Sequence, residues 1–305
     1  MTALAEQFLA DHVVRHLPSA FVGAAGRRYI AGPSRDDAIR TATELNGRGC
    51  DTTLDVLGEE TTTPEQASAT TAEYRELAPH LAPSVRRPNV SLKLTALGLN
   101  LGRDECERNL EAVCSVAERH GVSVHLDMEQ AVYTDRTFQI YDRFKARYPK
   151  TGMTLQACLR RTRDDAKWAV SLGATVRLCK GIYLEPSSIA FRDADEIRRQ
   201  YLATLEILLA GGCYVEIATH DRWLLDRSER MVQEHGLAPN RYEFQMLLGV
   251  THDAQGLLRS GHPLRIYVPY GKHWRKYVER RIHENPRILR HVARNMMLAP
   301  QVSGR

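Results

Sequence analysis

Short runs of apolar residues alternate with longer amphipathic stretches along most of the chain. We expect strands in eight segments: 50–59, 89–98, 122–129, 153–159, 174–183, 213–220, 242–250 and 264–271. The stretches between most of them have helical periodicity, as in 106–121 and 193–212. Strands that alternate with helices pair in parallel through right-handed crossovers. Eight such units predict an α/β fold of the closed (β/α)8 type, a TIM-like barrel.

Two segments flank the predicted barrel of residues 50–297. Residues 1–49 are expected to form an N-terminal helical arm or a cover at the bottom of the barrel, with helices at 4–17 and 35–47. Residues 298–305 are expected to be a C-terminal tail. We see no sign of a second independently folded domain in this pattern.

The composition is that of a water-soluble globular protein, with 43% hydrophobic and 26% charged residues. No run approaches the ~18 apolar residues of a membrane span, and the N-terminus lacks the pattern of a secretory signal. The six cysteines form no CxxC pair, which favours free thiols in a reducing compartment over disulfides or a zinc cluster. The expected location is the cytoplasm.

Positive charge gathers near the C-terminus. The net charge is +5, and residues 265–294 contain nine Lys or Arg against two Glu. Such a segment suits an anionic substrate, an anionic membrane or nucleic acid, although a solvated helix face has the same appearance.

Polar residues also recur at the ends of the predicted strands, where barrels of this kind keep their active sites. Burying an isolated charge costs several kcal/mol, so a set of charges on successive strands favours a site. The set consists of Glu59, Lys93, Thr95, Asp127, Glu129, Gln156, Arg177, Lys180, Thr219, His220, Asp221, Gln245, Tyr267 and Tyr270.

The segment YVERRIHE (277–284) follows the last strand and can fold over the barrel mouth. Its helical spacing places Tyr277, Arg280, Arg281 and Glu284 on one helix face. Paired guanidinium groups bind a carboxylate through two hydrogen bonds each, so this face predicts an anion clamp. An exposed face of salt bridges is the structural alternative.

Three other functions are compatible with parts of the pattern. A Schiff-base aldolase would use Lys93 or Lys180 as its nucleophile. A non-catalytic barrel would bind anions or nucleic acid through its basic C-terminal helix. A metal site would use His220, but the HxH pair of metal-dependent barrels is absent and its nearest substitute is His125 with Asp127. We therefore expect no metal and no nucleic acid.

Nine ordered motifs resemble those of the proline dehydrogenase family, from about residue 50 to residue 295. They are LDVLGE (54–59), SLKLTALG (91–98), HLDMEQ (125–130), LQACLRRT (155–162), VRLCKGIYLEP (176–186), IATHD (217–221), YEFQMLLGV (242–250), RIYVPYG (265–271) and YVERRIHE (277–284). The resemblance implies a distorted barrel with its last helix over the mouth, non-covalent FAD, and oxidation of L-proline to Δ1-pyrroline-5-carboxylate by hydride transfer. It also implies a quinone as electron acceptor and a monofunctional bacterial-type enzyme. The basic C-terminus and the amphipathic N-terminal segment are candidates for peripheral contact with the inner face of the cell membrane.

The same resemblance implies roles for individual residues. Arg280, Arg281 and Lys93 correspond to groups that bind the proline carboxylate, and Glu284 supports them. Tyr267 and Tyr277 correspond to aromatic residues at the substrate. Asp127 corresponds to the aspartate that organises the site through Tyr267 or Lys93, and Glu59 to the acid that pairs with Arg281. The positions that match flavin contacts are Gln156, Arg177, Lys180, Gly181, Thr219, His220 and Gln245.

One position departs from the family pattern, because Ile182 replaces the alanine expected in KGAY. Its side chain is expected near the substrate, where a larger group changes the pocket. The bulk of Tyr267 argues against hydroxyproline, which stays the alternative substrate.

Hydride transfer from the substrate requires that its amine is neutral. A cationic site lowers the pKa of that amine. We therefore assign no dedicated base and expect activity to rise with pH.

Overall fold

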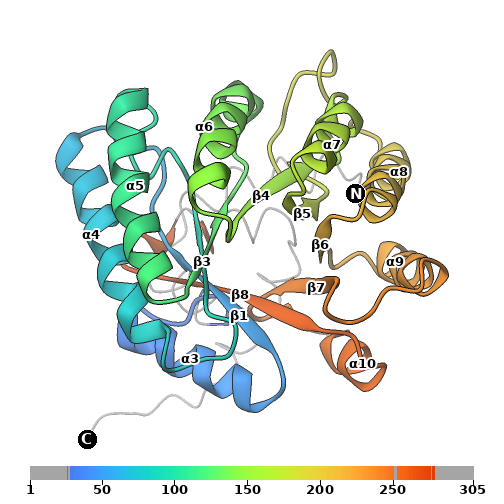
Figure 1. Cartoon of the computed structure of the whole chain (residues 1–305), viewed down its shortest axis with the longest axis horizontal. Helices are drawn as coiled ribbons and strands as arrows, with labels where there is room; N and C mark the ends of the chain where they lie inside the picture. The colour runs from blue at the N-terminus through green and yellow to red at the C-terminus, as the bar shows by residue number, and fades with distance from the viewer. Residues whose placement is uncertain (1–25, 27, 251–252, 276, 279–305) are drawn as a thin grey trace, which may run out of the picture.

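The computed structural model of the protein describes residues 26, 28–250, 253–275 and 277–278. Eight parallel strands form a closed barrel, in which each strand pairs with the next along the chain and β8 pairs with β1. Helices surround the barrel on its outside (Figure 1). The eight predicted strands and their order are therefore confirmed.

The elements follow one another in strict alternation over most of the chain. They are α3 (Arg35–Gly47), β1 (Asp51–Val56), α4 (Pro64–Leu81), β2 (Asn89–Leu92), α5 (Arg103–Arg119), β3 (Ser123–Leu126), the 3-10 turn η1 (Ala131–Tyr133), α6 (Thr134–Arg147), β4 (Thr151–Gln156), α7 (Thr162–Ser171), β5 (Thr175–Cys179), α8 (Ala194–Ala210), β6 (Tyr214–Ala218), α9 (Arg222–Glu234), β7 (Tyr242–Leu247), α10 (Ala254–Arg259) and β8 (Leu264–Tyr270).

Several strands end earlier than the apolar pattern predicts. Strand β2 stops at Leu92, and residues 94–101 form turns closed by bonds such as the one from the Leu97 N–H to the Leu94 carbonyl. Lys93 therefore lies just beyond the strand, and Asp127 likewise follows the end of β3. Lys93 and Asp127 thus occupy the first positions after their strands, whereas Arg177 and Tyr267 lie within β5 and β8.

The barrel sorts its side chains by polarity. Alternate strand residues such as Leu54, Leu178 and Phe244 are fully buried and join the hydrophobic core that includes the surrounding helices. The other set faces the barrel interior and is polar. This follows from contacts between strands that are not neighbours, because Arg177 on β5 bonds to Ser91 on β2.

A charged cluster closes the N-terminal end of the barrel. Arg265 donates to both carboxylate oxygens of Glu243, at 2.5 and 3.2 Å, and also to the Thr52 carbonyl. Arg87, whose φ of 45° is unusual for a residue with a side chain, pairs with Glu243 and Asp51. Buried charges are tolerated only when paired and hydrogen-bonded, and each of these is.

A second buried pair lies further into the barrel. The imidazole of His125 on β3 lies 3.2 Å from a Glu216 carboxylate oxygen on β6, and its other nitrogen is 3.1 Å from the Thr154 hydroxyl. Gly152 makes room for this ring, because a Cβ at that position would come within 2.4 Å of His125 Nδ1. The pairing crosses the barrel, since β3 and β6 are not adjacent.

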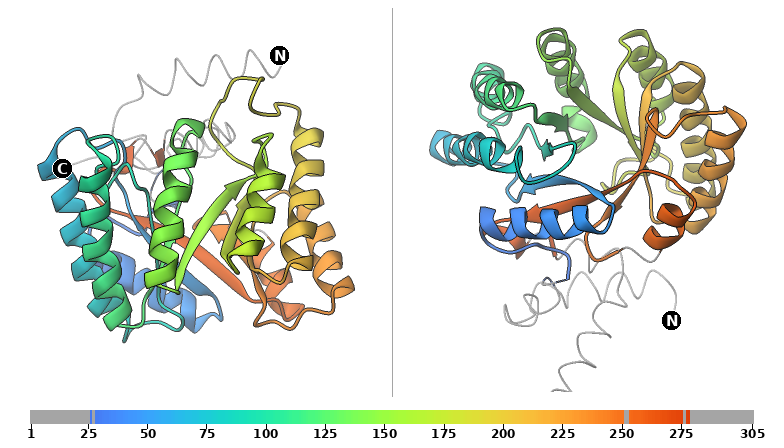
Figure 2. Two further views of the ribbon diagram at one scale, coloured as in Figure 1. Left: turned by 45° about the horizontal axis from the view of Figure 1, so that its top comes forward. Right: turned by 60° about the horizontal axis from the view of Figure 1, so that its bottom comes forward.

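Helix α3 lies on the barrel wall, where it contacts both β1 and β8 (Figure 2). It begins at a capping box in which Ser34 and Asp37 satisfy each other's backbone N–H groups. The sequence allowed a cover at the bottom of the barrel, and for residues 35–47 the structure instead gives a wall helix across the seam that closes the barrel. The predicted helix 4–17 lies outside the described residues.

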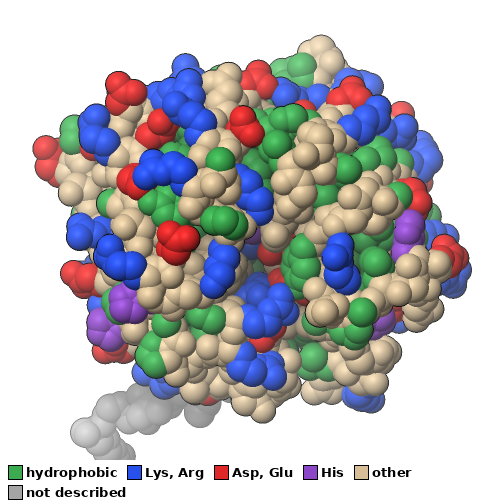
Figure 3. All heavy atoms as spheres, in the orientation of Figure 1, with side chains coloured by type: hydrophobic (Ala, Val, Ile, Leu, Met, Phe, Trp, Pro, Cys, Tyr) green, Lys and Arg blue, Asp and Glu red, His purple; other side chains and the backbone are tan. Residues whose placement is uncertain are grey.

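Acidic and basic side chains are interspersed on the face seen in Figure 3. Within the described part of the chain, no helix is long and apolar enough to cross a membrane.

Candidate active site at the carboxyl ends of the strands

Three of the predicted site residues meet at the carboxyl end of the barrel. The Tyr267 hydroxyl on β8 donates to Asp127 Oδ2 at 2.6 Å. The Lys93 ammonium lies 3.4 Å from the same oxygen. Asp127 is thus the shared acceptor that joins the ends of β2, β3 and β8.

Arg177 approaches Asp127 from the other side. Its guanidinium donates to Asp127 Oδ1 at 2.5 Å and to the Gln245 side-chain oxygen at 2.6 Å. It also lies over the Tyr267 ring, with its central carbon 5.5 Å from the ring centroid. Arg177 is 5% exposed, yet its Nη2 has no hydrogen-bond partner among the described residues. A buried donor of this kind normally has an acceptor, so it marks a place for a bound group.

The Gln245 amide is engaged on both sides. Its oxygen accepts from Arg177, and its nitrogen donates to Glu243 at 2.8 Å. The structure thus places Gln245 behind Arg177, as the link between the site and the charged cluster at the N-terminal end.

Neighbouring charges determine the protonation states of Asp127 and Lys93. Burial alone would raise the pKa of the Asp127 carboxyl, but Lys93 and Arg177 outweigh it and lower that pKa to about 2. Burial opposes the charge of Lys93, but Asp55 and Asp127 outweigh it and raise the pKa of the lysine. Lys93 is therefore held as an ammonium and Asp127 as a carboxylate.

Asp55 belongs to this cluster, although it was not among the predicted site residues. It lies on β1 and is 1% exposed, and both of its carboxylate oxygens are 3.5 Å from the Lys93 ammonium. The signal was present in the sequence as a charge in the middle of the apolar run LDVLGE. Ser91 and Glu216 were missed in the same way, because attention to strand ends passes over polar residues inside the strands.

The end of β3 carries a second buried carboxyl, that of Glu129. It is 2% exposed and accepts from the Thr95 backbone N–H at 3.1 Å and from the Thr95 hydroxyl. Burial raises the pKa of Glu129 to about 7. Gln156 at the end of β4 donates to the Glu129 carbonyl at 2.9 Å, so this predicted residue is tied to the same edge.

The segment after β5 contains three more predicted residues. Lys180 is partly exposed and pairs with Asp221 at 3.2 Å. Gly181 has a φ of +96°, and a Cβ there would lie 2.3 Å from the Cys158 sulfur. Ile182 is 50% exposed. This segment therefore requires glycine, and it presents Ile182 outward.

The residues that follow β6 form the N-terminal cap of α9. Asp221 caps the helix by accepting from the Trp223 N–H, while its own N–H bonds to the Thr219 hydroxyl. His220 Nε2 accepts from the Leu247 N–H at 2.9 Å. Among the described residues no group of three His, Cys, Asp or Glu side chains is arranged to hold a metal ion.

The remaining predicted residues are placed only in part. Glu59 lies three residues beyond the end of β1, close enough to Lys93 to raise the lysine pKa. Tyr277 is buried, with 6% exposure. Arg280, Arg281 and Glu284 lie outside the described residues.

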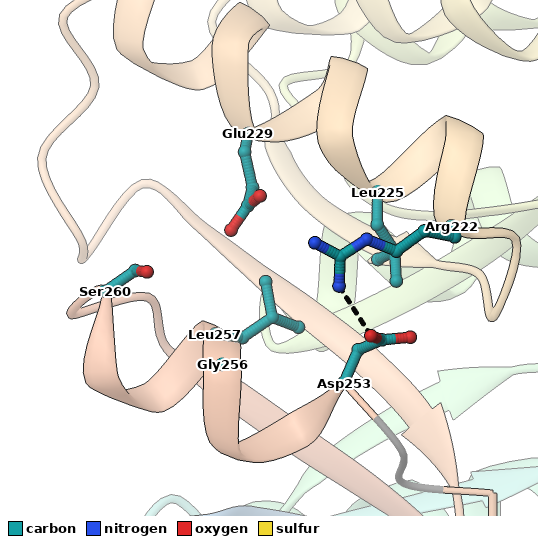
Figure 4. Close-up of a pocket in the computed structure, with 7 residues that line it drawn as sticks. All are labelled: Arg222, Leu225, Glu229, Asp253, Gly256, Leu257 and Ser260. Carbon is teal, nitrogen blue, oxygen red and sulfur yellow. Dashed lines mark hydrogen bonds and ion pairs between the residues drawn. The ribbon is translucent and has the colours of Figure 1, made fainter.

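A separate cavity of about 110 Å³ lies between α9 and α10 (Figure 4). Arg222 and Glu229 come from α9, and Arg222 is paired with Asp253 across the cavity at 2.5 Å. The cavity lies on the flank of the barrel, and neither Lys93 nor Asp127 lines it. It is therefore not the site at the strand ends.

Comparison with known proteins agrees with this geometry. The family model described as proline dehydrogenase matches residues 38–294. The chain belongs to the proline dehydrogenase family. It is therefore an oxidoreductase that acts on proline.

Two curated relatives match nearly their whole length. Proline dehydrogenase 2 of Bacillus subtilis is 35% identical over 264 residues, which cover 86% of this chain and 87% of that protein. Proline dehydrogenase of Deinococcus radiodurans is 31% identical over 276 residues, 88% of this chain and 89% of that protein.

Among solved structures, proline utilization A from Bdellovibrio bacteriovorus inactivated by N-propargylglycine is similar with a TM-score of 0.79. The identity is 24%, and the similarity covers 86% of this chain but 33% of that one. This likeness establishes the barrel fold.

Proposed function

We propose that the enzyme oxidises L-proline to Δ1-pyrroline-5-carboxylate by hydride transfer to non-covalently bound FAD, with a quinone as the final electron acceptor. The observation that carries this proposal is the cluster of Lys93, Asp127, Tyr267 and Arg177 at the carboxyl end of the barrel, in which the buried Arg177 Nη2 has no acceptor among the described residues.

The described residues fit a flavin. Arg177 Nη2 needs an acceptor, and polar atoms on a bound flavin would supply one. Gly181 lets the backbone after β5 turn with no side chain of its own. The flavin would supply the hydride acceptor. We propose that the residues that hold it are Gln156, Arg177, Lys180, Gly181, Thr219 and His220, with Gln245 acting through Arg177.

Substrate binding is proposed to use charge and shape together. The Lys93 ammonium attracts the proline carboxylate, and the proposed partners Arg280 and Arg281 supply the clamp. Tyr267, fixed by its bond to Asp127, limits how the ring can lie. Holding the reacting carbon in near-attack geometry contributes much of the rate in a reaction of this kind. Glu59, Tyr277, Glu284 and Ile182 complete the proposed substrate end.

The chemistry of Lys93 opposes the aldolase alternative. A Schiff base forms on a neutral amine, whereas two carboxylates hold Lys93 in its charged form. Lys180 is paired with Asp221 and partly exposed, so it lacks the desolvated environment that activates a lysine.

Absorption spectroscopy tests this function directly. The purified protein should show flavin absorption near ~450 nm that bleaches when L-proline is added without oxygen. Bleaching by hydroxyproline alone would keep the chemistry and change the substrate. A protein that stays colourless after incubation with FAD would contradict the proposal.

A further inference from the structure

Two carboxylates flank the Lys93 ammonium. Lys93 Nζ lies 3.5 Å from both oxygens of Asp55 and 3.4 Å from Asp127 Oδ2. Both carboxylates come from strands next to β2, with Asp55 on β1 and Asp127 at the end of β3. The charge that would attract a substrate carboxylate is thus already neutralised by the protein.

The two carboxylates differ in their other partners. Asp127 is also held by Arg177 and Tyr267, which stabilise its charge. Asp55 is buried, and none of its hydrogen bonds or ion pairs with described residues comes from a guanidinium. Burial and the nearby Asp127 charge raise the pKa of Asp55 to about 6, although Lys93 opposes the rise. The groups that face Asp55 are Lys93, Asp127, Tyr267, Glu59 and the Tyr74 hydroxyl of α4.

Tyr74 does little to stabilise the Asp55 charge. Its hydroxyl has one proton, and the short bond of 2.7 Å goes to the Ser91 carbonyl, whereas the distance to Asp55 is 3.4 Å. Of the two carboxyls within 3.5 Å of the Lys93 ammonium, Asp55 is therefore the one that accepts a proton more readily.

We propose that Asp55 is a positioning residue of the substrate end, which holds the Lys93 ammonium until a carboxylate ligand reaches it and then releases it by taking up one proton. The proton comes from solvent and forms one O–H bond on Asp55, and no bond of the ligand breaks. This inference rests on the proposed binding of the substrate carboxylate at Lys93.

The direction of the effect follows from charge. A bound carboxylate neutralises Lys93, which removes the attraction that keeps Asp55 ionised, and it adds a negative charge nearby. Both changes raise the pKa of Asp55 above its value of about 6 in the free protein. At pH 5 Asp55 is already protonated, so it takes up almost no proton when the ligand binds. Above pH 6 binding takes up a proton, and affinity falls by up to about tenfold for each pH unit.

Calorimetry on the holoenzyme measures this proton directly. The ligand is cyclopentanecarboxylate, which keeps the ring and carboxylate of proline but has no amine to titrate. Binding heats in two buffers of different ionisation enthalpy, at pH 5 and pH 7.5, give the number of protons taken up. At pH 5, where Asp55 is already protonated and the ligand carboxyl gives up any proton it carries when it binds as a carboxylate, we expect no net uptake, and at pH 7.5 we expect an uptake approaching one proton.

Substitution then assigns the proton. Asp55→Asn imitates the protonated form, so it should abolish the uptake and bind the ligand about tenfold or more tightly than the parent enzyme at pH 8, but equally at pH 5. Asp165→Asn is the matched control, because Asp165, like Asp55, is a buried carboxyl with a raised pKa and a cationic partner. Asp165 lies on α7, and its partner is Arg161. This control substitution should leave the proton count unchanged.

The possible outcomes distinguish the role of Asp55 from the existence of the carboxylate site. Uptake that persists in Asp55→Asn, or no uptake by the parent enzyme at pH 7.5, would overturn the role of Asp55 while leaving the proposed function intact. No binding of the ligand at any pH would overturn the carboxylate site itself, and the inference with it. If the Asn variant does not fold, the absence of proton uptake by the parent enzyme at pH 7.5 would still overturn the proposed role of Asp55.

Discussion

Asp127 connects four polar groups of the site. It accepts from Tyr267 and Ser91, pairs with Lys93 and pairs with Arg177. Each of these partners comes from a different element or strand end, so one carboxylate sets the relative positions of several functional groups. Its low pKa means that it does so at every pH at which the enzyme would work.

Replacing Asp127 with alanine should therefore reduce turnover more than cofactor content. We expect kcat to fall about 100-fold, because displacement of catalytic groups by about 1 Å can cost that much. The flavin-to-protein ratio should stay within about twofold, since the proposed flavin contacts are other side chains. The check is steady-state kinetics with flavin absorption, and Asp165→Ala serves as control. Loss of flavin in proportion to activity would contradict this role.

At the scale of elements, the positions where strands stop decide what the side chains can do. Lys93 and Asp127 lie one residue past the ladders of β2 and β3, and Gly181 lies two residues past β5. The turn after β5 is close-packed against β4, since the Cys158 N–H bonds to the Lys180 carbonyl at 2.8 Å. A small change in this turn would thus move Lys180 and Ile182 together.

Gly181→Ala tests how tightly that turn is held. The added methyl would meet Cys158 and would sit on a backbone with positive φ, so we expect a stability loss of about 1–3 kcal/mol and a lower flavin content. Gly173→Ala is the control, because Gly173 also has positive φ but has no atom within 4 Å of the added methyl. Thermal unfolding of both variants separates the clash from the backbone strain. Equal losses of stability in the two variants would mean that the Cys158 side chain moves aside to accommodate the added methyl.

The sequence predicted the barrel well because its apolar runs are strong and regularly spaced. It also identified Lys93, Asp127, Arg177 and Tyr267, whose meeting is visible only once the strands are closed into a barrel. It could not show that Asp55 shares Lys93. Strand periodicity gives the face of a residue, but not its distance from a residue 38 positions away.

Across the whole molecule, polar and charged side chains fill the barrel interior, while the apolar core lies between the strands and the helices. Gln245 joins the two ends of this interior, through Arg177 on one side and Glu243 on the other. The interior is thus a continuous hydrogen-bonded unit that runs from the N-terminal cluster to the proposed site.

Glu243→Gln should show how much stability this unit carries. Glu243 is 1% exposed and pairs with Arg265 and Arg87, so neutralising it leaves a buried guanidinium without its counter-charge. We expect a loss of about 3–5 kcal/mol in the free energy of unfolding by urea. Glu206→Gln removes a partner of His235 at the surface and should cost less than about 1 kcal/mol. Similar losses of stability for both variants would contradict the conclusion that the charge pairs inside the barrel stabilise the fold more than a surface pair does.

The contact between Gly152 and His125 has a consequence for how this lineage can change over time. A larger residue at position 152 cannot coexist with the imidazole, and without the imidazole Glu216 would lose a contact that lowers the pKa of its carboxyl. Positions 125, 152, 177 and 216 come from four strands and form one chain of contacts, because Gly152 makes room for His125, and Glu216 faces both His125 and Arg177. In a collection of related sequences these four should covary, or remain fixed together, while the apolar positions beside them drift independently.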